Sequence, residues 1–158
     1  MTQRAKKSYL CELHRYDLQE LLPAERDLVS KAKKASETAY APYSKFNVGA
    51  AALLSDNTVV FGSNQENAAY PSGLCAERVA LFACGAQQSG KRVLSLAVYA
   101  PALKDADAVP MPCGSCRQVM QETEHHQNAP LRILLITSNN HVYLAENAQT
   151  LLPFPFEF

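Results

Sequence analysis

Two short cysteine motifs constrain the fold of this chain more than any other part of its sequence. Cys75-Ala76-Glu77 and Pro112-Cys113-Gly114-Ser115-Cys116 each open a segment with helical periodicity. The last two cysteines are three residues apart, so at a helix start their side chains share one face. Backbone N–H groups and the positive end of the helix dipole stabilise thiolates there. All three cysteines can act together only if the fold brings the two helix starts side by side.

The three cysteines predict a zinc site. Thiolates from Cys75, Cys113 and Cys116 suit a soft tetrahedral cation, and three protein ligands leave the fourth position open for water or hydroxide. An open position is typical of a catalytic site rather than a structural one. Glu77 lies two residues from a ligand, within expected reach of that water, as the group that moves protons. We therefore expect one Zn²⁺ per chain and a catalytic Glu77.

Two other interpretations of the cysteines stay open at this point. Cys113-Gly114-Ser115-Cys116 alone is also typical of a thioredoxin-like redox pair. Three cysteines joined by a histidine from elsewhere would make a purely structural zinc site. Neither alternative gives a role to Glu77 or to Asn64-Gln65-Glu66. Cys11 and Cys84 are expected to be ordinary thiols outside the site.

Composition narrows the class of partner. The 158 residues fit a single domain, and 15 basic side chains balance 15 acidic ones, so no strong positive field attracts nucleic acid. No apolar run reaches the roughly 18 residues of a membrane span, and the polar N-terminus lacks a secretory apolar core. An odd number of cysteines favours thiols or metal ligands over disulfides. These features predict a cytoplasmic protein with a small-molecule substrate and no nucleic-acid or membrane partner.

Periodicity along the chain predicts helices alternating with strands. Helices are expected at Pro23 to about Tyr40, Ala76–Gln88 and Gly114–Glu124, with a short terminal one at Thr150–Leu152. Strands are expected at Val48–Leu54, Thr58–Phe61, Val93–Tyr99, Leu131–Thr137 and His141–Leu144. Residues 1–22 form a predicted N-terminal extension with the alternation of an added edge strand over Tyr9–His14, and residues 23–158 form the main domain. The predicted fold is α/β, a three-layer α/β/α sandwich with a mixed, about five-stranded sheet.

Further motifs carry a family resemblance. Residues 39–46 read Ala-Tyr-Ala-Pro-Tyr-Ser-Lys-Phe and are followed by Val48-Gly49-Ala50-Ala51, and Leu151-Leu152-Pro153 stands near the C-terminus. With the two cysteine motifs, they make the chain resemble the small, homotetrameric, three-cysteine cytidine deaminases from about Ala24 to Phe156. The resemblance implies the cytidine deaminase-like fold and a homotetramer. It also implies the hydrolysis of free cytidine and deoxycytidine to uridine, deoxyuridine and ammonia, in pyrimidine salvage.

The resemblance implies substrate contacts as well. Asn64 and Glu66 look like the pair that hydrogen-bonds the ribose hydroxyl, and Phe46 looks like a wall for the pyrimidine. The backbone N–H of Ala76 is similar to the donor that meets the base carbonyl. On composition alone, Asn64 and Glu66 are equally typical of a turn, and Phe46 of a core. A relative that acts on another aminopyrimidine nucleoside is a further alternative, in which the Asn-x-Glu pair still indicates a ribose.

Three more residues take roles from the same resemblance. Arg78 resembles an arginine whose guanidinium hydrogen-bonds zinc-bound thiolates, and physics supports this role because zinc with three thiolates carries a net negative charge. Tyr70 and Phe156 are implied to reach the site of a neighbouring subunit. Ser63 departs from the family, which often has a cysteine there, and the first twenty residues have no counterpart in its shortest members.

Overall fold

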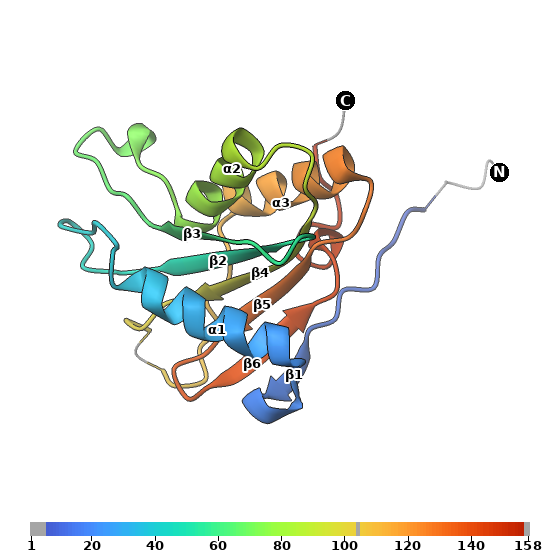
Figure 1. The fold of residues 1–158 in the computed structure, drawn as a ribbon, viewed down its shortest axis with the longest axis horizontal. Coiled ribbons are helices and arrows are strands. Elements are labelled where there is room, and N and C mark those ends of the chain that lie inside the picture. The colour runs from blue at the N-terminus through green and yellow to red at the C-terminus, as the bar shows by residue number, and fades with distance from the viewer. Residues whose placement is uncertain (1–5, 104, 157–158) are drawn as a thin grey trace.

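A mixed sheet of six strands forms the centre of the computed structural model, which describes residues 6–103 and 105–156 (Figure 1). The strands are β1 (His14–Asp17), β2 (Gly49–Leu54), β3 (Val59–Ser63), β4 (Val93–Tyr99), β5 (Arg132–Ile136) and β6 (His141–Ala145). They lie in the order β1-β6-β5-β4-β2-β3. Only β4 and β5 run parallel, and every other neighbouring pair is antiparallel. The predicted α/β class with a mixed sheet is confirmed.

Three helices cover the two faces of this sheet. Helix α1 (Pro23–Ser36) lies on one face, and α2 (Ala76–Gln87) and α3 (Gly114–Gln127) lie on the other (Figure 1). Short 3-10 turns complete the elements at η1 (Leu18–Glu20), η2 (Tyr70–Ser72) and η3 (Ala148–Thr150). None of the helices in the described part of the chain has both the length and the apolar composition that crossing a membrane requires. The arrangement is the predicted three-layer sandwich.

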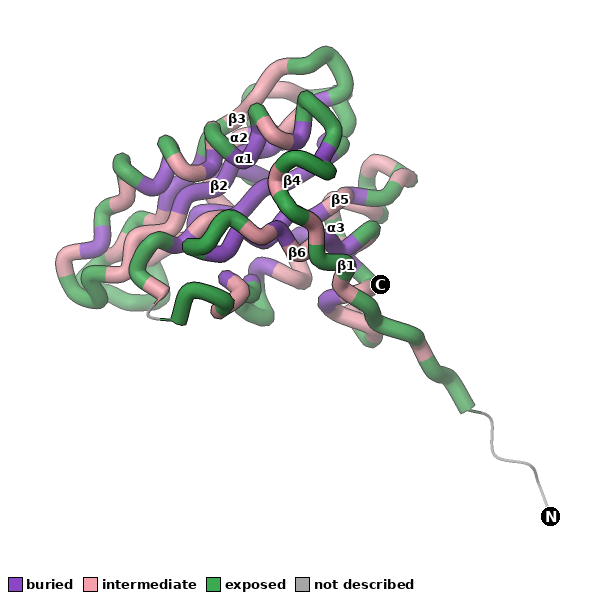
Figure 2. Tube along the Cα trace, turned by 90° about the horizontal axis from the view of Figure 1, so that it is seen from below, coloured by how far each residue is buried: buried purple, intermediate pink, exposed green. Residues whose placement is uncertain are grey.

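Two separate hydrophobic clusters hold the three layers together. One joins α1 to the sheet, and its members include Leu28, Val29, Ala32, Ala51, Ala97 and Leu134. The other joins α2 and α3 to the opposite face, and its members include Ala80, Leu81, Cys116, Met120, Leu96 and Ile133. Successive side chains of a strand point to opposite faces, so the central strands are buried along nearly their whole length (Figure 2). This burial on both faces explains why β4 and β5 lie in sequence segments that are almost entirely apolar.

The sheet has one strand more than the approximately five expected. The sixth is β1, which pairs antiparallel with β6 at the edge of the sheet, His14 opposite Leu144 and Asp17 opposite His141. It begins at His14, where the predicted alternation of Tyr9–His14 ends, and its pairing with β6 runs from His14 to Asp17. Residues 1–5 of the predicted extension lie outside the described residues, and the domain boundary at residue 23 stays a prediction.

Some predicted helix limits were wrong for identifiable reasons. Helix α1 ends at Ser36 instead of near Tyr40, because the backbone of Tyr40 turns to pair with another segment. Its N–H donates to the carbonyl of Asn64 at 2.9 Å, and its carbonyl accepts from the N–H of Glu66 at 2.8 Å. Helix α3 continues three residues beyond Glu124 and ends at Gln127. The next residue, Asn128, caps it in a left-handed conformation with φ 48°. The terminal helix is the single turn η3, two residues earlier than expected.

The position of α2 depends on a close approach at Gly62 in β3. A Cβ on Gly62 would overlap the carbonyl oxygen of Ala76 and the backbone nitrogen of Ala80. The first turn of α2 therefore lies directly on the backbone of β3, closer than any side chain permits. This contact fixes the start of α2, the residue Cys75 included.

We expect Gly62→Ala to lower the free energy of unfolding by about 1–3 kcal/mol, because the new methyl forces α2 away from β3. The matched control is Gly85→Ala. Gly85 is a residue of α2, and an added Cβ there meets no atom within 4 Å. That change should be neutral or stabilise by up to about 1 kcal/mol through helix propensity. Urea unfolding of the two variants measures both effects. Equal stability of Gly62→Ala and the wild type would contradict the close packing.

Candidate active site

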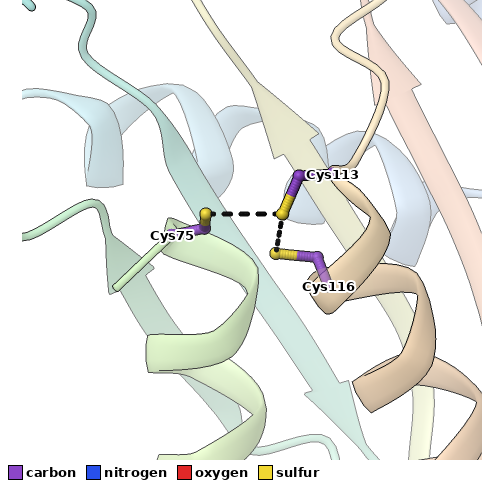
Figure 3. A group of neighbouring side chains, drawn as sticks. All are labelled: Cys75, Cys113 and Cys116. Atoms are coloured by element: carbon purple, nitrogen blue, oxygen red, sulfur yellow. Dashed lines mark hydrogen bonds between the residues drawn. The ribbon is translucent and has the colours of Figure 1, made fainter. Parts of the chain in front are cut away.

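Three thiols converge where α2 and α3 begin. Cys75 is the N-cap of α2 and Cys113 the N-cap of α3, each with extended backbone before its helix, and Cys116 lies in the first turn of α3. The Sγ atoms of Cys75 and Cys113 are 3.7 Å apart, and those of Cys113 and Cys116 are 3.5 Å apart. All three side chains point toward a common centre (Figure 3). The structure thus brings together the three cysteines that the sequence singled out.

The spacing of the sulfur atoms fits a zinc ion. Zinc–thiolate bonds of about 2.3 Å at tetrahedral angles place neighbouring sulfurs about 3.8 Å apart. The observed separations of 3.5 and 3.7 Å are close to that value. Among the described residues, these three cysteines are the only group with metal-ligand geometry, and no histidine joins them. That set favours the three-ligand site with an open position over a structural site completed by a histidine.

Electrostatics at the cluster favours a bound cation. The hydrogen bond from the thiol of Cys116 lowers the pKa of Cys75 to about 5, with further contributions from Arg78 and Cys113, although burial opposes the change. The same hydrogen bond and burial raise the pKa of Cys116. One sulfur therefore carries negative charge next to thiols that share its field. Nη2 of Arg78 lies 3.8 Å from Sγ of Cys75 and 3.4 Å from the carbonyl oxygen of Gly73, so its charge lies against the cluster.

Glu77 is the buried acid of the site. It occupies the first turn of α2 with only 5% of its surface exposed. Burial raises the pKa of its carboxyl, and the negative charge of Cys75 raises it further. A carboxyl with a raised pKa holds a proton more readily than an exposed one, which suits a group that accepts and returns protons. Its place beside the thiols is suited to proton transfer.

A cavity of about 890 Å³ opens beside the thiols. Its wall includes most of the side chains predicted from the sequence, namely Phe46, Asn64, Glu66, Tyr70, Cys75, Glu77, Arg78 and Cys113. Another part of the wall, which the sequence did not predict, comes from the segment between β4 and α3 and includes Leu103, Val109, Pro110 and Met111. Val109-Pro110-Met111 directly precedes the second cysteine motif. Apolar residues next to a metal ligand could therefore have predicted this part of the cavity wall from the sequence. The volume is in the range of small-molecule sites.

Asn64 and Glu66 contact the protein in ways that the sequence did not predict. The Asn64 side chain accepts from the N–H of Val48 at 2.8 Å and donates to the carbonyl of Phe46 at 2.9 Å. The Glu66 carboxylate accepts from the N–H groups of Tyr43 at 2.9 Å and Ser44 at 3.2 Å, and from the Ser44 hydroxyl. An amide and a carboxylate each keep further hydrogen-bonding capacity after these contacts. Both residues therefore shape the cavity wall and can still meet a ligand.

The remaining predicted residues lie in three different settings. Ala76 is fully buried as the first residue of α2, where backbone N–H groups have no acceptor within the helix. Tyr70 is 77% exposed at the cavity, with its ring edge-on to that of Tyr43 at 6.2 Å. Phe156 lies outside the wall of this cavity, and its backbone N–H and carbonyl are both bound by the side chain of Gln118. The fold of one chain does not bring Phe156 to the thiols.

Comparisons with known proteins agree on one family. Residues 23–129 match the family model of the cytidine and deoxycytidylate deaminase zinc-binding region. A cytidine deaminase of Halalkalibacterium halodurans is 50% identical over 96 residues, which cover 60% of this chain and 68% of that protein. One from Mycobacterium tuberculosis is 45% identical over 95 residues, with coverage of 60% and 68%. The crystal structure of cytidine deaminase from Burkholderia pseudomallei superposes with a TM-score of 0.70 at 39% identity, covering 82% of this chain and 97% of that one.

We expect about one zinc ion per chain, held by the three thiolates. Cys113→Ala should lose most of it, because two thiolates bind zinc far more weakly than three. The control is Cys11→Ala, since Cys11 is exposed and lies outside the cluster, and this variant should keep its zinc. Elemental analysis of the purified proteins measures both. Full zinc in the Cys113→Ala protein would refute the ligand assignment and revive the redox interpretation.

Proposed function

This chain belongs to the cytidine and deoxycytidylate deaminase family, and from that premise we propose that it hydrolyses free cytidine and deoxycytidine to uridine, deoxyuridine and ammonia. The reaction is a step of pyrimidine salvage. The observation that carries the proposal is the placement of Cys75, Cys113 and Cys116 beside the buried Glu77 in the wall of one cavity. Three ligands and a neighbouring acid are the parts that a hydrolytic zinc site needs.

Cys75, Cys113 and Cys116 would hold zinc, which when bound would make a water molecule more acidic. The Glu77 carboxylate accepts a proton from the attacking water and gives it to N3 of the pyrimidine ring. The water oxygen forms a bond to C4, and the bond from C4 to the amino nitrogen breaks. Glu77 then accepts the remaining proton of that oxygen, which becomes the C4 carbonyl, and gives it to the departing nitrogen, so that cytidine and water become uridine and ammonia. The raised pKa of Glu77 suits a group that accepts and returns protons within one cycle.

The residues around this acid orient the nucleoside. Arg78 offsets part of the negative charge of the thiolates through its contact with Cys75 and so helps keep the water acidic. The N–H of Ala76 donates to the carbonyl of the base, and the ring of Phe46 packs against the pyrimidine. Asn64 and Glu66 bind the ribose hydroxyl with the hydrogen-bonding capacity that their loop contacts leave over.

The charges of the cavity support a nucleoside rather than a nucleotide. Among the described residues of the wall, the ionisable side chains other than the cysteines and tyrosines are Glu66, Glu77 and Arg78. The guanidinium of Arg78 already contacts Cys75 and the carbonyl of Gly73. A phosphate near Glu66 would meet the charge of that carboxylate, and Lys45, a cation whose charge acts on Glu66, lies outside the cavity wall. This argues for an uncharged sugar in the substrate.

The same proposal includes a homotetramer. Tyr70 lies at the cavity with 77% of its surface exposed, and Phe156 takes its role from the resemblance to the small, homotetrameric cytidine deaminases. We assign them to the site of a neighbouring subunit. A cytoplasmic location fits because a reducing compartment keeps the three thiols free to bind zinc. Nucleic acid and membranes are not part of this function.

Glu77→Gln should keep the fold and the zinc but lose activity, because an amide can hydrogen-bond water without accepting its proton. The expected loss in kcat is at the top of the roughly 10²–10⁴-fold range of general acid–base groups, or beyond it, since Glu77 acts in several transfers. Ammonia release from cytidine measures it, with the exposed Glu122→Gln as the control that should match the wild type. A loss below about tenfold would remove Glu77 from the centre of the mechanism.

Glu66→Gln should lower kcat/KM for cytidine by roughly 10- to 150-fold, the usual effect of losing a charge-assisted hydrogen bond. Free cytosine has no ribose, so its slow turnover should barely change, and zinc should stay bound. A 3′-phosphate removes the donor hydroxyl and adds negative charge, so 3′-CMP should be a poor substrate of the wild type. Steady-state kinetics with cytidine, cytosine and 3′-CMP test this. Turnover of 3′-CMP as fast as cytidine would rule out the assigned role of Asn64 and Glu66.

A further inference from the structure

The loop of residues 41–46, between α1 and β2, links two parts of the site through one hydroxyl group. The Oγ of Ser44 accepts from the N–H of Phe46 at 3.0 Å and donates to the Glu66 carboxylate. Phe46 forms the wall assigned to the base, and Glu66 is assigned to the sugar. We propose that Ser44 is a positioning residue, which orients the Glu66 carboxylate toward the nucleoside sugar. This inference rests on the proposed function and extends it to a residue with no role in the chemistry.

The direction of the two hydrogen bonds supports this role. A hydroxyl has one proton, and the N–H of Phe46 occupies a lone pair of the Ser44 oxygen, so the proton is left to point at Glu66. The same carboxylate receives the backbone N–H groups of Tyr43 and Ser44. Three donors from one short loop thus hold both oxygens of Glu66. The hydroxyl alone contacts Oε1, whereas the two amides contact Oε2, so Ser44 fixes the rotation of the carboxylate.

The loop itself is held in a conformation that a free chain seldom adopts. Lys45 lies in the left-handed region with φ 57°, which is uncommon for a residue with a side chain. Its N–H donates to the carbonyl of Ala41 at 3.1 Å, closing the turn. On the far side, the Asn64 side chain holds the carbonyl of Phe46. Phe46 is therefore fixed at its N–H by Ser44 and at its carbonyl by Asn64, which gives the Ser44 hydroxyl a rigid frame.

The charge of Glu66 fits the same role. The hydrogen bond from Ser44 is the main reason that the pKa of Glu66 lies below its ordinary value, and the backbone N–H groups of Tyr43 and Ser44 lower it further, although burial opposes them. The carboxylate is then fully ionised at neutral pH and acts as an acceptor. Without the hydroxyl it keeps its two amide donors but loses the contact that orients Oε1. Loss of the Ser44 hydroxyl should therefore cost less than loss of the carboxylate.

A double-mutant cycle of Ser44→Ala with Glu66→Ala tests the proposal. Ser44→Ala should lower kcat/KM for cytidine by roughly three- to tenfold, mostly through KM, the range of one ordinary hydrogen bond. Turnover of free cytosine should fall clearly less than turnover of cytidine, and the zinc content should stay at the wild-type value. In the Glu66→Ala background, the same change should cost less than about twofold, because the group that Ser44 orients is gone.

Two further comparisons separate the hydroxyl from the fold of the loop. Ser44→Thr and Ser44→Val have the same shape and differ in the hydroxyl, so Thr should retain more activity on cytidine even if Ala disturbs the loop. Ser138→Ala removes a hydroxyl that donates to Ala106, away from the cavity, and should match the wild type. Equal activity of the Thr and Val variants would overturn the proposal. So would an equal loss on cytidine and cytosine, or full additivity with Glu66→Ala.

The failure of the underlying function would look different. If the wild type released no ammonia from cytidine, both the proposed function and the role of Ser44 would be wrong. If Glu66→Ala left kcat/KM for cytidine unchanged, the assignment of Glu66 to the sugar would be wrong, and the role of Ser44 with it. A strong effect of Glu66→Ala together with a harmless Ser44→Ala would overturn the role of Ser44 alone.

Discussion

The positions of the three thiols depend on two helices, α2 and α3, whose N-termini lie side by side. Cys75 and Cys113 are the N-caps of α2 and α3, so each sulfur stands at the positive end of a helix dipole, and Cys116 follows one turn along α3. Three thiolates would repel one another without a cation between them, and the hydrophobic cluster beneath the helices holds the two helix starts together. The core on this face, with Met120 and Leu81, is thus the support of the metal site.

The second requirement is that α2 lies very close to the sheet. Gly62 permits contact between backbones, which places the first turn of α2 over β3 and keeps Glu77 out of solvent. An acid at that depth has a raised pKa because water no longer stabilises its charge. A missing side chain in a strand therefore influences the acidity of a carboxyl on the helix above it. Packing and proton chemistry are linked through this one position.

The sequence predicted what depends on local pattern, and it missed what depends on contacts between distant segments. Periodicity located strands β2 to β6 and helices α1 to α3, and Val93–Tyr99 was correct to the residue, because a strand buried on both faces is apolar throughout. The zinc cluster was predictable because ligand chemistry restricts residue type and spacing together. The end of α1 was wrong because Tyr40 pairs with a segment far along the chain. The loop contacts of Asn64 and Glu66 were missed for the same reason, since their partners at residues 43–48 lie on the other side of a hairpin.

The pairing of β1 with β6 affects the order in which the molecule can assemble. It joins the first strand of the sheet to the last, so this hydrogen-bonded ladder cannot form until nearly the whole chain has emerged from the ribosome. Until then the outer edge of β6, or of β5 before it, offers unpaired backbone groups to other nascent chains. The α1, β2, β3 and α2 segment has its contacts close together in sequence and can form earlier. Pairing of β1 with β6 is therefore a late step of folding during synthesis. Until it occurs, the growing chain has an unpaired strand edge that can aggregate.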